Sequence, residues 1–142
     1  MILVDANVLI YAVDADSPHH GPARRWLEEA LSGATPVGLS WIVILAFLRL
    51  TTRAGILRRQ LPPDRALAFV DEWLAQPNVS VVTPGAGRWP VLRKLLRDTG
   101  TAGNLTSDAH LAAAALELGA SVCSTDSDFE RFPGVERVNP LQ

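Results

Sequence analysis

The chain has 142 residues, of which 48% are hydrophobic and 20% are charged, as is typical of one globular domain with a substantial core. We therefore expect a single domain over residues 1–142. The net charge of −2 excludes a general attraction to nucleic acids or membrane surfaces, so a nucleic-acid contact would need a local basic patch. The single cysteine, Cys123, excludes an internal disulfide, and no segment reaches the roughly 18 apolar residues of a membrane span. No secretory signal is apparent either, and we expect a cytoplasmic protein with no membrane partner.

The chain begins MILVDANVLI, an apolar run that is interrupted at Asp5. Such a run, closed by a polar break, predicts a buried strand, because both faces of an interior strand are covered. Asp5 would then lie at the carboxyl end of the strand, where open α/β sheets place their ligands. It could equally cap the next helix by accepting a hydrogen bond from the amide of Asn7 or Val8. This stretch alone leaves both roles open.

The remaining chain alternates between helical and extended patterns, which predicts a mainly parallel sheet covered by helices. We expect further strands at residues 36–40, 78–82, 121–124 and 135–138. We expect five helices. The first begins at Ser17-Pro18 and ends at Gly33, and the second covers 41–53 after a cap by Ser40. The third runs from 62–64 to 74, the fourth includes 88–97, and the fifth runs from a cap by Thr106 or Ser107 to Gly119.

Two of these helices carry distinct expectations. The helix over 41–53 is apolar on nearly every side until Arg49, so it should be largely buried or form an interface, and we expect a homodimer. The helix that includes 88–97 should turn Trp89 and its leucines inward. Its basic residues, Arg88 among them, should then face outward.

Four acids fall where the predicted elements begin or end. Asp5 ends the first strand, Asp108 lies in the first turn of the last helix, and Asp126 and Asp128 follow the strand at 121–124. In a parallel sheet the strand C-termini and the following helix N-termini share one edge, so these carboxylates should converge there. Each could also act locally, Asp108 at a helix start and the other two in a turn.

Convergence of carboxylates requires a cation, since clustered carboxylates otherwise repel and raise one another's pKa. Oxygen ligands favour Mg²⁺, with Mn²⁺ as the alternative, and such an ion can activate water at a phosphoryl centre. The residues themselves therefore indicate metal-dependent phosphate-ester chemistry.

Three separated segments, VDANVLIYA, GNLTSDAHLAAAALELGA and CSTDSDFERFPGV, resemble the PIN-domain VapC-type toxins of bacterial toxin–antitoxin systems. The resemblance covers essentially the whole chain. It implies a three-layer α/β/α sandwich with a central, mainly parallel sheet. It also implies a Mg²⁺-dependent endoribonuclease that cleaves RNA and is inhibited by a cognate VapB-type antitoxin.

The resemblance assigns roles to particular residues. The implied catalytic acids are Asp5, Asp108, Asp126 and Asp128, and the first three of them are the implied metal ligands. Asn7 and Ser124 stand where the family has residues that support the pocket. Arg49 and Arg53, four residues apart on one predicted helix, are our candidates for RNA binding.

One position departs from the family. Where members commonly carry a glutamate, in a pattern like LAEL, this chain reads LAFL with Phe47, and residues 30–63 contain no acid. This favours one firmly held metal over two. It also leaves open an alternative function, a catalytically weakened domain that binds RNA or an antitoxin.

A second alternative is a haloacid-dehalogenase-like phosphatase, which also begins with an aspartate at the end of its first strand. That family requires a second aspartate two residues later, where this chain has Asn7.

Overall fold

The structure is a computed structural model that describes residues 1–100 and 102–142. In this part of the chain, parallel strands form one sheet in the order β3-β2-β1-β4-β5. The strands are β1 (Ile2–Val4), β2 (Val37–Ser40), β3 (Val79–Val82), β4 (Ser121–Cys123) and β5 (Arg137–Val138). The α-helices are α1 (Ala6–Val13), α2 (His20–Ser32), α3 (Trp41–Thr52), α4 (Pro63–Leu74), α5 (Arg88–Thr99) and α6 (Thr106–Leu118). Two 3₁₀ helices, η1 (Gly103–Leu105) and η2 (Ser127–Arg131), flank α6 and β4 along the chain.

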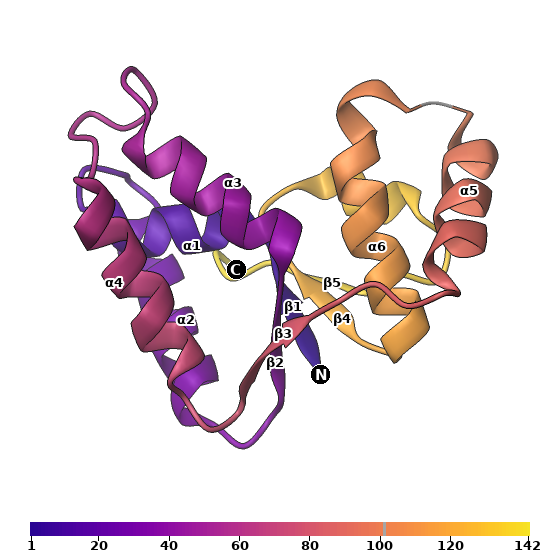
Figure 1. Ribbon diagram of the computed structural model, residues 1–142, viewed down its shortest axis with the longest axis horizontal. Helices are drawn as coiled ribbons and strands as arrows, with labels where there is room; N and C mark the ends of the chain where they lie inside the picture. The colour runs from indigo at the N-terminus through magenta and orange to yellow at the C-terminus, as the bar shows by residue number, and fades with distance from the viewer. Residues whose placement is uncertain (101) are drawn as a thin grey trace.

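The helices form two layers around the sheet. In Figure 1, α1 to α4 lie on one side of the strands and α5 and α6 lie on the other. The expected three-layer α/β/α sandwich is confirmed, and every strand pairing described is parallel. Each connection between the first four strands contains two helices, which is why the layers are thick relative to the short strands.

The order of the strands fixes where a ligand can bind. The chain adds β2 and then β3 on one side of β1, and then crosses to place β4 on the other side. A crevice forms outside the carboxyl ends of the strands where the order reverses, here between β1 and β4. Asp5 directly follows β1, and Ser124 directly follows β4, so both lie at this point.

The sheet interior is tightly packed. Leu3 of β1 pairs in register with Gly38 of β2, and both Leu3 and Val4 are fully buried. A Cβ atom at Gly38 would lie 2.5 Å from Cδ2 of Leu3 and 2.7 Å from Cγ2 of Val82. Glycine at this position therefore lets the two flanking side chains meet over β2.

Helix α6 packs against the sheet through small side chains. Its buried positions include Ala109 and the run Ala112–Ala115, and the helix contacts both β1 and β4. Alanine favours the helix and also lets its backbone approach the strands closely. Asp108, in the first turn of α6, is thereby held beside the carboxyl ends of those strands.

The helix ends agree with the sequence in two cases and differ in a third. Ser40 caps α3 by accepting a hydrogen bond from the amide of Val43, and Gly119 ends α6 in the left-handed region with φ +62°. The cap expected from Thr106 or Ser107 is wrong. Because η1 leads directly into α6, the N-cap position is Leu105, and no side chain caps the helix.

The orientation predicted for α5 is confirmed for its leucines and for Arg93, Lys94 and Arg97, but it is wrong for the first two residues of the helix. Trp89 is 64% exposed, whereas Arg88 is only 6% exposed. Arg88 faces α6, where its Nε lies 2.6 Å from Oε1 of Glu117 and its Nη1 lies 3.4 Å from Nε2 of His110. The carboxylate of Glu117 makes burial of the guanidinium possible at the start of the helix, while the indole stays exposed.

Helix α3 divides its apolar residues between the core and the surface. Val43, Ile44 and Phe47 are buried, but Trp41 and Leu45 are 52% and 58% exposed. This helix was expected to be largely buried or to form an interface, and part of its apolar surface is exposed. Across the described residues, no helix is both long and apolar enough to cross a membrane.

The Arg88–Glu117 pair should contribute strongly to stability. We expect Glu117→Ala to lower the free energy of unfolding by about 3 kcal/mol, because it leaves the Arg88 charge buried without a partner. The double variant Arg88→Met/Glu117→Leu should regain most of this loss, which urea denaturation would measure. Asp98→Ala, which breaks the exposed Lys94–Asp98 pair, is the control and should change the value by less than about 0.5 kcal/mol. Equal effects of Glu117→Ala and Asp98→Ala would contradict this account.

Candidate active site

Asp5 has both of its carboxylate oxygens held in place. Oδ1 accepts a hydrogen bond from the amide of Ala6 at 2.8 Å. Oδ2 accepts one from Oγ of Ser124 at 2.7 Å and one from Nδ2 of Asn7 at 3.2 Å. Burial raises the pKa of Asp5, although the hydrogen bonds from Ser124 and Ala6 act in the opposite direction. Asp5 therefore caps α1 and also faces the strand-end crevice, so the two roles left open by the sequence coexist, although the amide that donates is that of Ala6 and not the expected Asn7 or Val8.

Asn7 and Ser124 tie the ends of β1 and β4 together. The Ser124 hydroxyl is buried and accepts hydrogen bonds from Nδ2 of Asn7 at 3.2 Å and from the amide of Asp126 at 3.0 Å. Oδ1 of Asn7 accepts from the amide of Thr125 at 3.3 Å. This network fixes Asp5 relative to the chain that carries Asp126.

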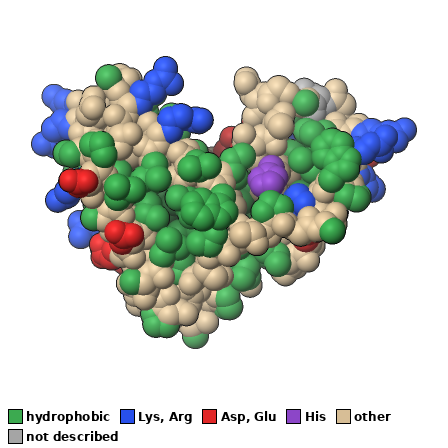
Figure 2. Space-filling model, viewed as in Figure 1, with side chains coloured by type: hydrophobic (Ala, Val, Ile, Leu, Met, Phe, Trp, Pro, Cys, Tyr) green, Lys and Arg blue, Asp and Glu red, His purple; other side chains and the backbone are tan. Residues whose placement is uncertain are grey.

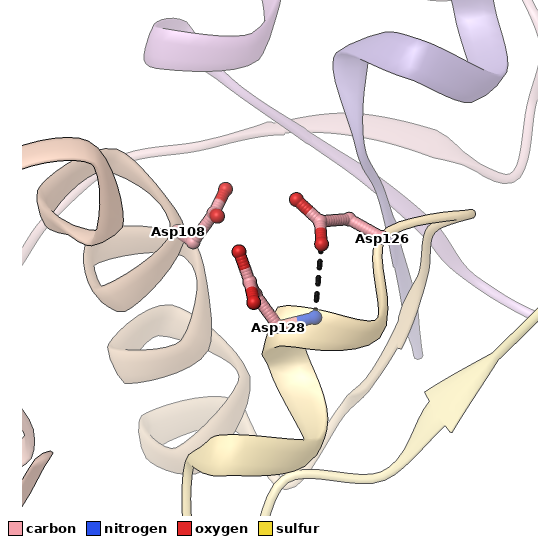
Figure 3. Close-up of side chains that lie close together, drawn as sticks. All are labelled: Asp108, Asp126 and Asp128. Atoms are coloured by element: carbon pink, nitrogen blue, oxygen red, sulfur yellow. Dashed lines mark hydrogen bonds between the residues drawn. The ribbon is translucent and has the colours of Figure 1, made fainter.

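The other three acids come together from two elements. Figure 3 shows Asp108 projecting from α6 towards Asp126 and Asp128, which lie at the start of η2. One carboxylate oxygen from each of the three can be chosen so that all lie within 4.8 Å of one another. Oδ1 of Asp126 also accepts a hydrogen bond from the amide of Asp128 at 2.9 Å, so the predicted local cap is present as well. Asp5 lies outside this group of three.

The electrostatics of Asp108 link all four acids. Burial and then the charges of Asp5, Asp126 and Asp128, in that order of size, together raise the pKa of Asp108 to about 7. These neighbours repel the ionised form, and a cation would remove that repulsion. The donor set is made of carboxylate oxygens alone, which fits a hard divalent ion such as Mg²⁺ or Mn²⁺.

A cavity of about 370 Å³ opens beside these acids. Asp5, Ser107, Asp108 and Arg49 form its polar lining. Its apolar wall comes from Ala6, Ile42, Val43, Leu45, Ala46 and Leu111. Figure 2 shows the molecule hollowed between the lobe that carries α3 and the lobe that carries α6. Of the two predicted RNA-binding residues, Arg49 lines the cavity, whereas Arg53 ends α3 outside it.

Phe47 occupies a different face of α3. Its ring is fully buried and packs edge-to-face against Trp73 of α4, with the ring centroids 4.9 Å apart. The α3 residues that line the cavity include Ala46 and Arg49, and none of them is an acid. Helix α3 thus supplies no carboxylate to this cavity, and Phe47 serves the core.

One polar residue of the cavity was not expected there from the sequence. Ser107 was expected only as a cap, but it lines the cavity beside Asp108. Cys123 is buried in β4, and burial raises the pKa of its thiol to about 12. A thiol with that pKa stays protonated and is a poor nucleophile.

The chain belongs to the PIN domain family, whose pattern matches residues 2–135. It is 49% identical to the protein named Ribonuclease VapC37 of Mycobacterium tuberculosis over 140 residues, 99% of this chain and 97% of that protein. It is 40% identical to Ribonuclease VapC33 of the same species over 142 residues, 100% of this chain and 99% of that protein.

Solved structures show the same fold at low identity. VapBC2 from Rickettsia felis, bound to a DNA fragment from its promoter, matches with a TM-score of 0.71 and 19% identity, covering 98% of both chains. VapC20 of M. tuberculosis, described as a sarcin-ricin loop cleaving toxin, matches with a TM-score of 0.69 and 21% identity over 92% of this chain and 93% of that one.

The raised pKa of Asp108 leads to a prediction on pH and stability. The pKa is about 7 in the folded protein and near its ordinary value of 3.8 in the unfolded chain, so the folded state binds the proton more tightly. With EDTA, the contribution of this group to stability is therefore lost as the pH rises from about 4 to above 7. Asp108→Asn should raise the melting temperature at pH 8 but not at pH 4, and Mn²⁺ should stabilise the wild type more than the variant. The exposed Asp71→Asn is the control, and a gain for Asp108→Asn that did not depend on pH would contradict the assignment.

Substitutions on two faces of α3 should distinguish the face that packs in the core from the face that lines the cavity. Phe47→Glu should lower the free energy of unfolding by more than about 3 kcal/mol, because it removes a buried ring and buries an unpaired carboxylate. Ala46→Glu adds the same carboxylate to the face that lines the cavity, and it should tighten Mn²⁺ binding as measured by calorimetry. Tighter binding by Phe47→Glu than by Ala46→Glu would show that this division of α3 is wrong.

Proposed function

We propose that this protein is a Mg²⁺-dependent endoribonuclease, the toxin of a VapB–VapC pair. The observation that carries the proposal is the crowding of four carboxylates at the strand-order reversal, where burial, together with repulsion from the other three acids, raises the pKa of Asp108 to about 7. Full-length relatives at 49% and 40% identity that are named as VapC ribonucleases support the same activity.

The proposed metal ligands are Asp108, Asp126 and Asp5, with Asp128 completing the acidic cluster. When bound, a divalent ion would stabilise negative charge on a phosphoryl oxygen and lower the pKa of a water molecule. Mg²⁺ is the ion we propose, and Mn²⁺ offers the same preference for oxygen ligands. Two observations support this assignment: carboxylate oxygens of Asp108, Asp126 and Asp128 lie close together, and the charge of Asp5 raises the pKa of Asp108.

The protein's own groups hold these acids in place and offer a site for the substrate. Ser124 and Asn7 donate to Oδ2 of Asp5 and so fix the direction in which that carboxylate points. Arg49, in the same cavity, can bind a phosphate oxygen of RNA through its guanidinium. The apolar side chains of α3 and α6 limit the access of water to the inner part of the cavity.

We propose two protein partners, a second copy of this chain and a cognate VapB-type antitoxin. Trp41 and Leu45 expose large apolar surfaces, and Leu45 lines the acidic cavity. A chain that covered this part of α3 would also block access to Asp5 and Asp108. The solved VapBC complexes that share the fold are consistent with a partner of this kind.

The alternative is a domain that binds RNA or antitoxin with little cleavage. It is favoured by one observation, the absence of any acid among the α3 residues that line the cavity. Turnover distinguishes the two functions, because both include RNA binding but only the first includes efficient metal-dependent cleavage.

Cleavage of single-stranded RNA by the purified protein tests the proposal. We expect EDTA to abolish cleavage and Mg²⁺ to restore it. Asp5→Asn and Asp108→Asn should each lower the rate by more than about 100-fold, and Ser124→Ala by about 10- to 100-fold, as for the loss of a group that orients a ligand. The exposed Asp71→Asn should cleave like the wild type.

Two results would overturn this assignment. Cleavage retained in both Asp5→Asn and Asp108→Asn would show that these acids are not the catalytic ones. RNA binding without turnover in Mg²⁺ or Mn²⁺ would favour the alternative function.

A further inference from the structure

A second cavity adjoins the acidic cluster. Its volume is about 430 Å³, and its lining comes from the end of α5, the η1 turn and η2: Thr99, Ala102, Gly103, Asn104, Leu105, Asp128 and Arg131. Asp108 lines the first cavity and Asp128 lines the second, while oxygens of these two acids belong to the same close group. The acidic cluster therefore lies between a cavity bounded by α3 and a cavity bounded by η1 and η2.

Each cavity contains one arginine that has no acidic partner among the described residues. Arg49 lines the first cavity and Arg131 the second, and both are exposed. Five other basic residues, Arg24, Arg59, Arg88, Lys94 and Arg137, form ion pairs with acids. Several exposed arginines outside the two cavities, such as Arg93, form none in the described residues either, so it is the place beside the acids that distinguishes Arg49 and Arg131. Arg131 shares its cavity with Asp128 but makes no ion pair with it. Both guanidinium groups are thus available to an anion beside the acids.

The two cavities suit a chain in which negatively charged phosphates alternate with planar bases. Volumes of about 370 and 430 Å³ lie near the lower end of the roughly 300–1,000 Å³ that is common for small-molecule sites. Arginine binds phosphate with two parallel hydrogen bonds. Asn104, in the second cavity, adds an amide that can both donate to and accept from a base edge.

We propose that a single RNA strand crosses the acidic cluster through both cavities, with Arg49 and Arg131 binding phosphates on opposite sides of the cleaved bond. This path rests on the proposed ribonuclease function and specifies its substrate as an extended single strand. The two arginines act as positioning residues, because they anchor the strand on either side of the acids. Arg53, outside both cavities, has no part in this path.

Binding measurements with matched variants test the path. The probe is a single-stranded RNA of ten nucleotides centred on a bond that the wild type cleaves, bound by proteins that carry Asp108→Asn to prevent cleavage. Arg49→Gln and Arg131→Gln should each weaken binding about tenfold, as expected for the loss of a charged hydrogen bond. Each should also reduce the slope of log affinity against log salt by about 0.7, which is one phosphate contact on a single strand. Arg93→Gln removes an equally exposed arginine from α5, outside both cavities, and should change neither quantity.

Neutral linkages assign each arginine to one side of the cleaved bond. A methylphosphonate on one side should remove the effect of Arg131→Gln and leave that of Arg49→Gln intact, and a methylphosphonate on the other side should do the reverse. Arg131→Lys should restore part of the affinity, which a merely structural role would not require.

The results distinguish failure of the proposed RNA path from failure of the proposed ribonuclease function. If Arg131→Gln behaves like Arg93→Gln while the wild type cleaves the RNA, the strand does not enter the second cavity and the path is wrong. If one methylphosphonate removes the effects of both Arg49→Gln and Arg131→Gln, the two arginines bind the strand on the same side of the cleaved bond, and the strand does not cross the cluster. A wild type that neither binds nor cleaves any RNA would overturn the proposed function itself.

Discussion

The pairing of β1 with β4 is the contact on which the site depends. Val4 and Cys123 are partners in register, and the amide of Asp5 donates to the carbonyl oxygen of Cys123 at 2.9 Å. These backbone bonds place Asp5 and Ser124 side by side although they are 119 positions apart in the chain. The short hydrogen bond between their side chains then follows from the sheet, since both residues continue strands that are already aligned. The direction of the Asp5 carboxylate is therefore set by strand pairing rather than by the loop in which it lies.

The acidic cluster is in tension with the stability of the fold. Four carboxylates that repel one another do not stabilise the folded state. The hydroxyl of Ser124 and the side-chain amide of Asn7 donate hydrogen bonds to only one of them, Asp5. The protein tolerates this because the remaining structure is well satisfied: in the described residues, no buried side-chain nitrogen or oxygen lacks a hydrogen-bond partner. Strain confined to one site within a satisfied framework is common where stability is exchanged for function.

Much of the fold could be predicted from the sequence, because strands and helix ends depend on local residue types. The apolar run before Asp5, the Ser40 cap and the stop at Gly119 are of this kind. The burial of Arg88 at the start of α5 could not be predicted in this way, because it depends on Glu117, which lies in another helix. Asp5, Asp108, Asp126 and Asp128 could be nominated from their positions at element ends, but the place of Arg131 could not, since an arginine after a turn carries no local signal. The face of α3 occupied by Phe47 likewise emerges only from its contact with Trp73.

The row of alanines on α6 acts as a spacer of minimum thickness between that helix and the sheet. The distance from the helix axis to β1 and β4 determines how far Asp108 stands from Asp5. Evolution can therefore change the separation of the acids from beneath, by exchanging methyl groups for larger side chains, without altering any polar residue.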